Sequence, residues 1–206
     1  MAVLTGNQIV DRILREPDWE RRLTVSPVLN LKEQVSGNSL DVRLGSHFIT
    51  HKRTNVPSID PNEFKIEDIT KIEEERFTPI GNSFVLHPRQ FTLGGTLEYI
   101  GMPNDLVAYV VGKSSWGRLG LVIATATGVH SCFRGIITLE IANLGEVPLR
   151  LYPGRPIAQL FFHESEPQSF DKADVGAGFA SVKPEGSRLT PYSPIDAMRE
   201  RLGYSI

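Results

Sequence analysis

Leu40-Asp41-Val42-Arg43-Leu44 alternates apolar and charged residues, which is the period-two pattern of a β-strand with one buried face. Further short apolar segments follow along the chain, separated by Gly and Pro residues, and no long helical pattern lies between them. Many short strands at this spacing indicate a β-sandwich or β-barrel rather than a sheet built of βαβ units. We expect the other strands at Ser83–Leu86, Gln90–Leu93, Leu106–Val111, Ile136–Ala142, Pro148–Leu151 and Ile157–Phe162.

Both ends of the chain differ from this strand-rich middle. Near the N-terminus, Thr5 and Gln8 have the spacing of a capping box, and the apolar residues that follow share one face of a short helix. The charged segment Asp60–Arg76 is expected to form a surface excursion or a short helix. After Phe162 the composition shifts to Gly, Ser, Pro and charged residues. We therefore expect one domain over residues 1–163 and a C-terminal tail over residues 164–206.

The composition excludes several classes of protein. The 206 residues, 40% of them hydrophobic, can bury a core of ordinary size. A formal charge of −2 offers no net attraction to a nucleic acid polymer or an anionic membrane. The single cysteine, Cys132, rules out an internal disulfide, a four-cysteine iron–sulfur cluster and a zinc site with two or more thiolates. Because no secretory signal or membrane-span pattern is present, we expect a soluble cytoplasmic protein.

The segment Gly112-Lys113-Ser114-Ser115-Trp116-Gly117-Arg118 follows an apolar strand. Its two glycines, adjacent hydroxyls and two cations suit a polyanion held by backbone N–H, hydroxyl and guanidinium donors. It does not match the P-loop pattern, because the lysine follows a single glycine and no long helix succeeds it. By itself, the segment is compatible with a phosphate site and with a simple polar turn.

Two polar residues interrupt apolar strands. Glu140 lies within Ile136–Ala142, and Gln159 lies within Ile157–Phe162. A carboxylate buried among apolar neighbours has a raised pKa, which suits a general acid or base, unless a cation such as Arg118 pairs with it. We expect Glu140 to be buried, and the spacing leaves both roles open. A buried Gln159 amide would need a partner, either the backbone or a ligand.

Several motifs, in one order, resemble the dCTP deaminase branch of the dUTPase-like superfamily, over about residues 4–162. The motifs are Asn38–Leu44, Phe84–Pro88, Phe91–Gly94, Thr96–Glu98, Gly112–Ser115, Gly117–Leu121, Gly135–Asn143, Pro153-Gly154 and Gln159-Leu160. The resemblance implies a mainly β subunit, a dUTPase-like distorted β-barrel or jelly roll with a short N-terminal helix. It also implies a flexible C-terminal tail that acts as an active-site lid, and a homotrimer with sites between subunits.

The resemblance implies hydrolytic deamination of dCTP to dUTP and ammonia, with Mg²⁺ carried on the triphosphate and no zinc. Glu140 would take a proton from water and pass one to the leaving ammonia, while Ser114 and Arg118 would position that water. A pKa near neutrality would suit a carboxylate that acts first as a base and then as an acid. The substrate contacts implied are Lys113, Ser114, Ser115, Arg118, Ala126, His130, Phe133, Gln159 and Lys183.

One loop departs from the family pattern, because the chain reads Val129-His130-Ser131-Cys132-Phe133 where the family usually has Ile-Asp-Pro-Gly-Phe. The family's Asp contacts the deoxyribose, and in the dUTPase relatives it is the water-activating base. A histidine is not a fixed anion, so His130 cannot do the same. Two alternatives therefore stand beside dCTP deamination: a non-catalytic nucleotide-binding trimer that acts as a sensor or regulator, and a divergent deaminase or pyrophosphatase for another deoxynucleotide. We expect Cys132 to be a small packing residue rather than a nucleophile.

Overall fold

The computed structural model describes residues 2–52, 54–56, 58–60, 68, 71–124, 128–167 and 181–186. Within these residues almost every element is a strand. The strands are β1 (Thr24–Ser26), β2 (Val35–Ser36), β3 (Ser39–His51), β4 (Glu73–Phe77), β5 (Phe84–Leu86), β6 (Phe91–Gly101), β7 (Leu106–Gly112), β8 (Leu121–Ile123), β9 (Gly128–Val129), β10 (Arg134–Asn143), β11 (Leu149–Leu151) and β12 (Pro156–Glu164). The helices are α1 (Gly6–Leu14), α2 (Leu31–Gln34) and α4 (Ser114–Gly117).

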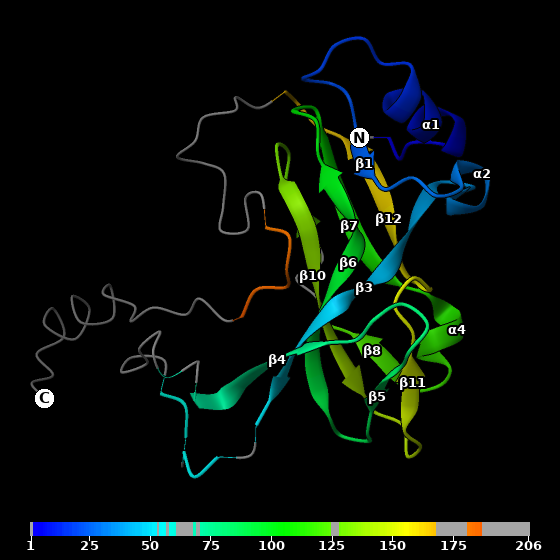
Figure 1. The fold of residues 1–206 in the computed structure, drawn as a ribbon. Coiled ribbons are helices and arrows are strands. Elements are labelled where there is room, and N and C mark those ends of the chain that lie inside the picture. The colour runs from blue at the N-terminus through cyan, green and yellow to red at the C-terminus, as the bar shows by residue number, and fades with distance from the viewer. Residues whose placement is uncertain are drawn as a thin grey trace, which may run out of the picture.

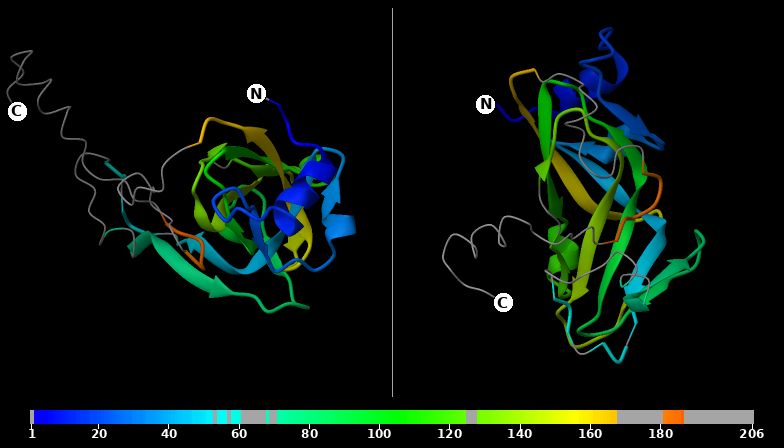
Figure 2. Two further views of the ribbon diagram at one scale, coloured as in Figure 1. Left: turned by 90° about the horizontal axis from the view of Figure 1, so that it is seen from above. Right: turned by 90° about the vertical axis from the view of Figure 1, so that its left-hand side faces the viewer.

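Ten of the described strands form one antiparallel sheet that curls around a single core (Figure 1). Its strands follow the order β8-β10-β6-β3-β12-β7-β9, with β1, β2 and β4 attached at the side of this path. Seen from above, the strands surround a common centre (Figure 2). A small second sheet pairs β11 with β5. The prediction of a mainly β, distorted barrel is confirmed.

The alternation predicted from the sequence decides which side chains fill this core. Along β10 every second residue is buried, so Ile137, Leu139 and Ile141 point inward. The side chains between them lie on the outer face of the sheet. The same alternation places Leu40, Val42 and Leu44 of β3 in the core. Apolar burial on one face is the main stabilising term of such a sheet.

Helix α1 begins at the predicted capping box. The hydroxyl of Thr5 accepts a hydrogen bond from the Gln8 backbone N–H, and the Gln8 side chain accepts one from the Thr5 N–H. Ile9 is fully buried against the barrel, whereas Leu14 is 63% exposed, so only part of the predicted apolar face packs. None of the helices in the described part of the chain has the length and apolar character needed to cross a bilayer.

The prediction for the charged segment Asp60–Arg76 is wrong at its C-terminal end. Residues Glu73–Phe77 form the edge strand β4, which pairs with His47–His51 of β3. The glutamates there are mostly exposed, and charge on an edge strand discourages pairing with other chains. Much of the remainder of the segment, including residues 61–67, lies outside the described residues.

Strand β6 extends beyond the predicted Gln90–Leu93 and includes Gly94 and Gly95. At Gly95 a Cβ atom would stand 2.5 Å from Cδ1 of Ile136 on the neighbouring strand β10. A side chain at Gly95 would therefore have to displace the end of the Ile136 side chain.

A short piece of the C-terminal segment, residues 181–186, crosses the outer face of the sheet (Figure 1). The Ile136 N–H donates to the Ser181 carbonyl at 3.0 Å, and the Glu185 N–H donates to the Thr138 hydroxyl at 3.1 Å. Lys183 then reaches Glu75 of β4, at 3.3 Å. The rest of the predicted tail, residues 168–180 and 187–206, lies outside the described residues.

Candidate functional site

The Lys113–Arg118 turn is held at the end of β7 by backbone contacts to β12. The Lys113 N–H donates to the Ile157 carbonyl at 3.1 Å, and the Trp116 indole donates to the Pro156 carbonyl at 3.0 Å. The short helix α4 closes with the Arg118 N–H bonded to the Ser114 carbonyl. Ser114, Ser115 and Arg118 are exposed, so the turn presents hydroxyl and guanidinium donors to solvent.

Lys113 and Gln159 are brought together with a residue that sequence reasoning did not select, Asp41. In the sheet, Gln159 lies opposite Asp41 on one side and opposite Val111 on the other. The Lys113 Nζ lies 2.5 Å from Asp41 Oδ2. Gln159 is half-buried, and its side-chain oxygen is 3.4 Å from the Ser39 hydroxyl. Alternation alone identifies Asp41 only as an outward polar residue, so no sequence signal revealed this pair.

Glu140 is half-buried, and the expectation that it is a buried carboxylate is wrong. Its strand buries the odd-numbered residues, which leaves Glu140 on the outer face of β10 with Ile136 and Thr138. The Ala124 N–H donates to the Glu140 carbonyl at 2.8 Å, which continues the pairing of β8 with β10. The accessible position of Glu140 suits a group that meets a ligand better than a core ion pair.

The loop that departs from the family pattern lies at the other end of β7. Val129 pairs with Ala108, which leaves the following His130 exposed. The Ser131 hydroxyl donates to the Leu106 carbonyl at 2.8 Å. Phe133 is half-buried and packs against the core. The loop is thus fixed to the barrel while His130 faces solvent.

Cys132 is buried in this loop, as expected for a packing residue. Its φ of +66° lies in the left-handed region that favours glycine. That conformation agrees with the glycine found at this place in the family pattern. Burial raises the pKa of the Cys132 thiol, which keeps it protonated and unreactive near neutral pH.

The His130 loop and the Lys113 turn lie at opposite ends of β7. Ala108, beside the His130 loop, and Lys113 are five strand positions apart, which is roughly 17 Å along β7. The strand of Glu140 lies nearer to the turn, because β8 follows α4 in the chain and pairs with β10. Ala126 lies outside the described residues.

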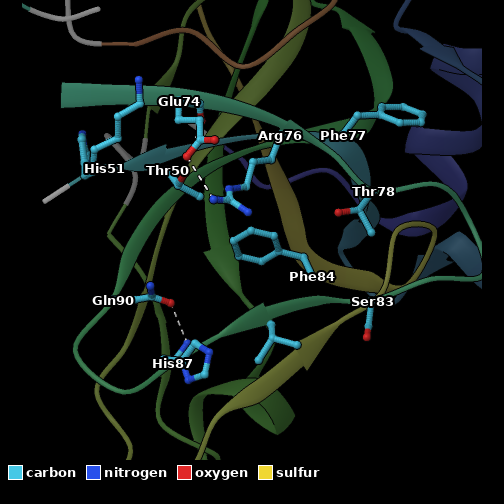
Figure 3. Close-up of a pocket in the computed structure, with 12 residues that line it drawn as sticks. Thr50, His51, Glu74, Arg76, Phe77, Thr78, Ser83, Phe84, His87 and Gln90 are labelled. Carbon is cyan, nitrogen blue, oxygen red and sulfur yellow. Dashed lines mark hydrogen bonds and ion pairs between the residues drawn. The ribbon is translucent and has the colours of Figure 1, made fainter. Parts of the chain in front are cut away.

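A separate pocket of about 780 Å³ lies where β3, β4 and β5 meet (Figure 3). Arg76 points into it toward Thr50 and Phe84, and pairs with Glu74 at 3.0 Å. The Gln90 side chain closes one end by accepting from the His87 backbone N–H at 2.8 Å. The motif Phe84–Pro88 contributes Phe84, Val85 and His87 to this pocket, but none of the residues assigned to the substrate or to catalysis lines it.

Metal-binding side chains are scattered over the described residues. No group of three or more His, Cys, Asp or Glu side chains there lies close enough to hold one ion. A cation that accompanies a triphosphate would therefore be held chiefly by the phosphate oxygens, which are the hard ligands that Mg²⁺ prefers.

Comparisons with known proteins find relatives that share one description. A family model described as dCTP deaminase-like matches residues 3–165. A "dCTP deaminase, dUMP-forming" of Methanobrevibacter smithii is 37% identical over 195 residues, which cover 92% of this chain and 96% of that protein. A "dCTP deaminase" of Halorubrum lacusprofundi is 42% identical over 163 residues, covering 79% of this chain and 77% of that protein.

A solved structure shares the fold. The crystal structure of 2'-deoxycytidine 5'-triphosphate deaminase from Agrobacterium tumefaciens superposes with a TM-score of 0.58 at 22% identity. The match covers 78% of this chain and 46% of that one. With the family model spanning most of the barrel and relatives near 40% identity, the chain belongs to the dCTP deaminase-like family.

Proposed function

We propose that this protein deaminates dCTP hydrolytically to dUTP and ammonia, in the cytoplasm. The observation that carries the proposed deamination is the 37% identity to a "dCTP deaminase, dUMP-forming" over nearly the full length of both chains. The half-exposed position of Glu140 agrees with it, because a group that exchanges protons with water and substrate has to be accessible. The substrate is dCTP with Mg²⁺ on its triphosphate.

In this reaction water attacks C4 of the cytosine, and the amino group leaves as ammonia. Glu140 takes a proton from the water and returns one to the leaving nitrogen, so one carboxylate serves as base and then as acid. Ser114 and Arg118 orient the water, which replaces the positioning that zinc provides in other deaminases. The triphosphate is held by the Lys113-Ser114-Ser115 turn, with Arg118 and Gln159. The remaining contacts assigned to the substrate are Ala126, His130, Phe133 and Lys183.

A complete site requires two copies of the chain. This step rests on the family resemblance, which implies sites between subunits. We propose a homotrimer in which one subunit supplies Glu140 and its neighbour supplies the Lys113–Arg118 turn. Closed cyclic symmetry repeats such a shared site at each interface.

The experiment compares wild type with Glu140→Gln on Mg²⁺·dCTP, following ammonia release and product mass. We expect wild type to form dUTP and ammonia, and Glu140→Gln to lose at least about a thousandfold in kcat, because an amide cannot shuttle the proton. Glu146→Gln, at an exposed loop carboxylate, is the matched control and keeps full activity. Neither ammonia nor a deaminated product from wild type would refute the proposal.

A second outcome of the same assay is favoured by several relatives that are described as dUMP-forming. Formation of dUMP and pyrophosphate needs a second water activated near the phosphates. Because His130 stands where the resemblance expects an aspartate, we propose that the reaction stops at dUTP. Pyrophosphate and dUMP in the product mass spectrum would assign the second step as well.

The alternatives give different readouts. A non-catalytic sensor binds a deoxynucleotide in a calorimetric titration but releases no ammonia. A divergent deaminase or pyrophosphatase leaves dCTP unchanged and converts another member of a deoxynucleotide panel. The two measurements together separate all three functions.

A further inference from the structure

We infer that Asp41 is a positioning residue that holds the Lys113 ammonium ready for the triphosphate. The inference rests on the proposed function, which makes Lys113 a phosphate contact. Asp41 lies on β3 and is outside the set of residues that the sequence motifs assign to the site. Its role would be exerted entirely through Lys113.

The burial of Asp41 makes its pairing with Lys113 strongly favoured. The Asp41 side chain is 11% exposed, and its Oδ2 lies 2.5 Å from the Lys113 Nζ. Its other oxygen, Oδ1, is buried without a hydrogen-bond partner among the described residues. A buried carboxylate that lost its cation would be left uncompensated. The carboxylate therefore keeps the ammonium in place.

Lys113 is restrained at both ends. Its backbone N–H is bonded to the Ile157 carbonyl at 3.1 Å, and its ammonium is held by Asp41. A free lysine side chain loses considerable rotamer freedom when it binds a phosphate, and a lysine already held in place loses less. The side chain remains 28% exposed, and an ammonium has three N–H donors, so it can bond to a phosphate while paired.

Asp41 also lies next to the other phosphate-binding residue in the proposed site. Gln159 is its register partner on β12, and Val111 follows in the same row on β7, two residues before Lys113. The outer face of β3 thus supports two phosphate contacts from neighbouring strands. A group that acts on the phosphates, away from the reacting base, changes substrate binding more than the chemical step.

The test compares wild type, Asp41→Asn, Lys113→Gln and the double variant D41N/K113Q. Steady-state kinetics use Mg²⁺·dCTP, and calorimetry measures Mg²⁺·dCTP binding in the Glu140→Gln background. We expect Asp41→Asn to raise KM and Kd about tenfold with kcat within about threefold. In the Lys113→Gln background, Asp41→Asn should leave KM and Kd unchanged, because Asp41 then has no lysine ammonium to position.

Asp11→Asn is the matched control, because it breaks an exposed ion pair with Arg15 of 2.6 Å and should leave every constant unchanged. An unchanged or lower Kd for Asp41→Asn, or a further loss on adding it to Lys113→Gln, would overturn the inference. Should Asp41→Asn alone fail to fold, the neutral pair D41N/K113Q restores charge balance, and comparison with Lys113→Gln decides. If wild type binds dCTP without turnover, the proposed function fails, while the calorimetric comparison still tests Asp41.

Discussion

Glu98 lies fully buried on β6, where three hydrogen bonds meet its carboxylate. The Arg43 backbone N–H donates to Oε2 at 2.8 Å, and the Arg43 guanidinium donates to Oε1 at 2.9 Å. The Gln34 amide donates to Oε1 at 3.2 Å. Burial nevertheless raises the pKa of Glu98, since loss of hydration outweighs the opposing effect of Arg43. This cluster joins α2, β3 and β6 inside the barrel.

The raised pKa of Glu98 predicts a defined pH dependence of stability. Folding raises the pKa of Glu98 above its ordinary value of 4.5. The stabilisation from this group is therefore fully present below pH 4.5, and it is lost progressively as the pH rises through the folded-state pKa. Glu98→Gln should cost about 2 kcal/mol near pH 5, because the amide NH2 of glutamine cannot accept a hydrogen bond from Arg43, whose donors meet both carboxyl oxygens. The difference in the free energy of unfolding between wild type and Glu98→Gln should become smaller as the pH rises. Denaturant unfolding from pH 5 to pH 8 measures it, and a widening difference would contradict the assignment.

Substitutions at Cys132 test how strongly the left-handed backbone conformation of the His130 loop limits the residue at this position. Cys132→Val should destabilise the fold by about 2 kcal/mol or more, because a β-branched side chain is strongly disfavoured at a φ of +66°. Cys132→Gly is the matched change and should stay within about 1 kcal/mol of wild type, since relief of the backbone offsets the lost packing. Thermal unfolding of both variants provides the measurement. Equal losses of stability in the two variants would show that side-chain packing, rather than the backbone conformation, determines which residue is tolerated at this position.

At the scale of elements, the conformation of the proposed phosphate-binding turn depends on how the chain returns from α4 to the sheet. After α4, Gly120 adopts a φ of +91°, and a Cβ atom there would stand 2.6 Å from the Gly145 backbone N. The Leu144 N–H donates to the Gly120 carbonyl at 2.8 Å, which ties the turn to the end of β10. The turn and the Glu140 strand are therefore connected through this glycine contact.

Gly120→Ala should disturb this connection, while Gly117→Ala three residues earlier should not. At Gly120 both the backbone conformation and the contact exclude a methyl group, so a loss of more than about 2 kcal/mol is expected. At Gly117, within α4, a Cβ atom would meet nothing within 4 Å, and alanine should leave stability unchanged or raise it by up to about 1 kcal/mol. Denaturant unfolding compares the two. Similar losses at both positions would argue against the contact with Gly145.

At the scale of the whole molecule, the sheet curls until β8, at one end of the strand order, meets β7 near the other end (Figure 2). A Cβ atom at Gly112 of β7 would stand 3.7 Å from Cδ1 of Ile123 on β8, the register partner of Ile141. The residues 181–186 cross the β10 side, close to Thr138 on the same face as Glu140. In the proposed trimer, a neighbouring subunit completes each site.

Subunit complementation tests this arrangement. Arg118→Ala and Glu140→Gln should each be inactive alone, whereas co-expression should restore about one quarter of wild-type activity. That fraction follows because, in randomly mixed rings, one site in four receives Glu140 and Arg118 from intact neighbours. Mixing the purified proteins under conditions without subunit exchange serves as the control. Co-expressed mixed trimers without activity would place both groups in one subunit.

The alternation of Leu40–Leu44 predicted a central strand and its inward apolar residues, because side-chain direction in a strand follows directly from sequence position. The strand Ile136–Ala142 was also predicted, but its apolar residues on both faces did not show which face is buried. The edge strand β4 was missed, since its glutamates form no apolar alternation and pairing with β3 alone makes it a strand.

By itself, the sequence determined the fold class, the N-terminal cap and the family, because these depend on local patterns and on the order of motifs. Only the tertiary structure decided that Glu140 is accessible and that Asp41 holds Lys113. Burial of a side chain depends on which face of a curled sheet the core occupies and on what covers the other face. A contact such as Asp41–Lys113 joins residues 72 positions apart through strand register, which no local pattern encodes.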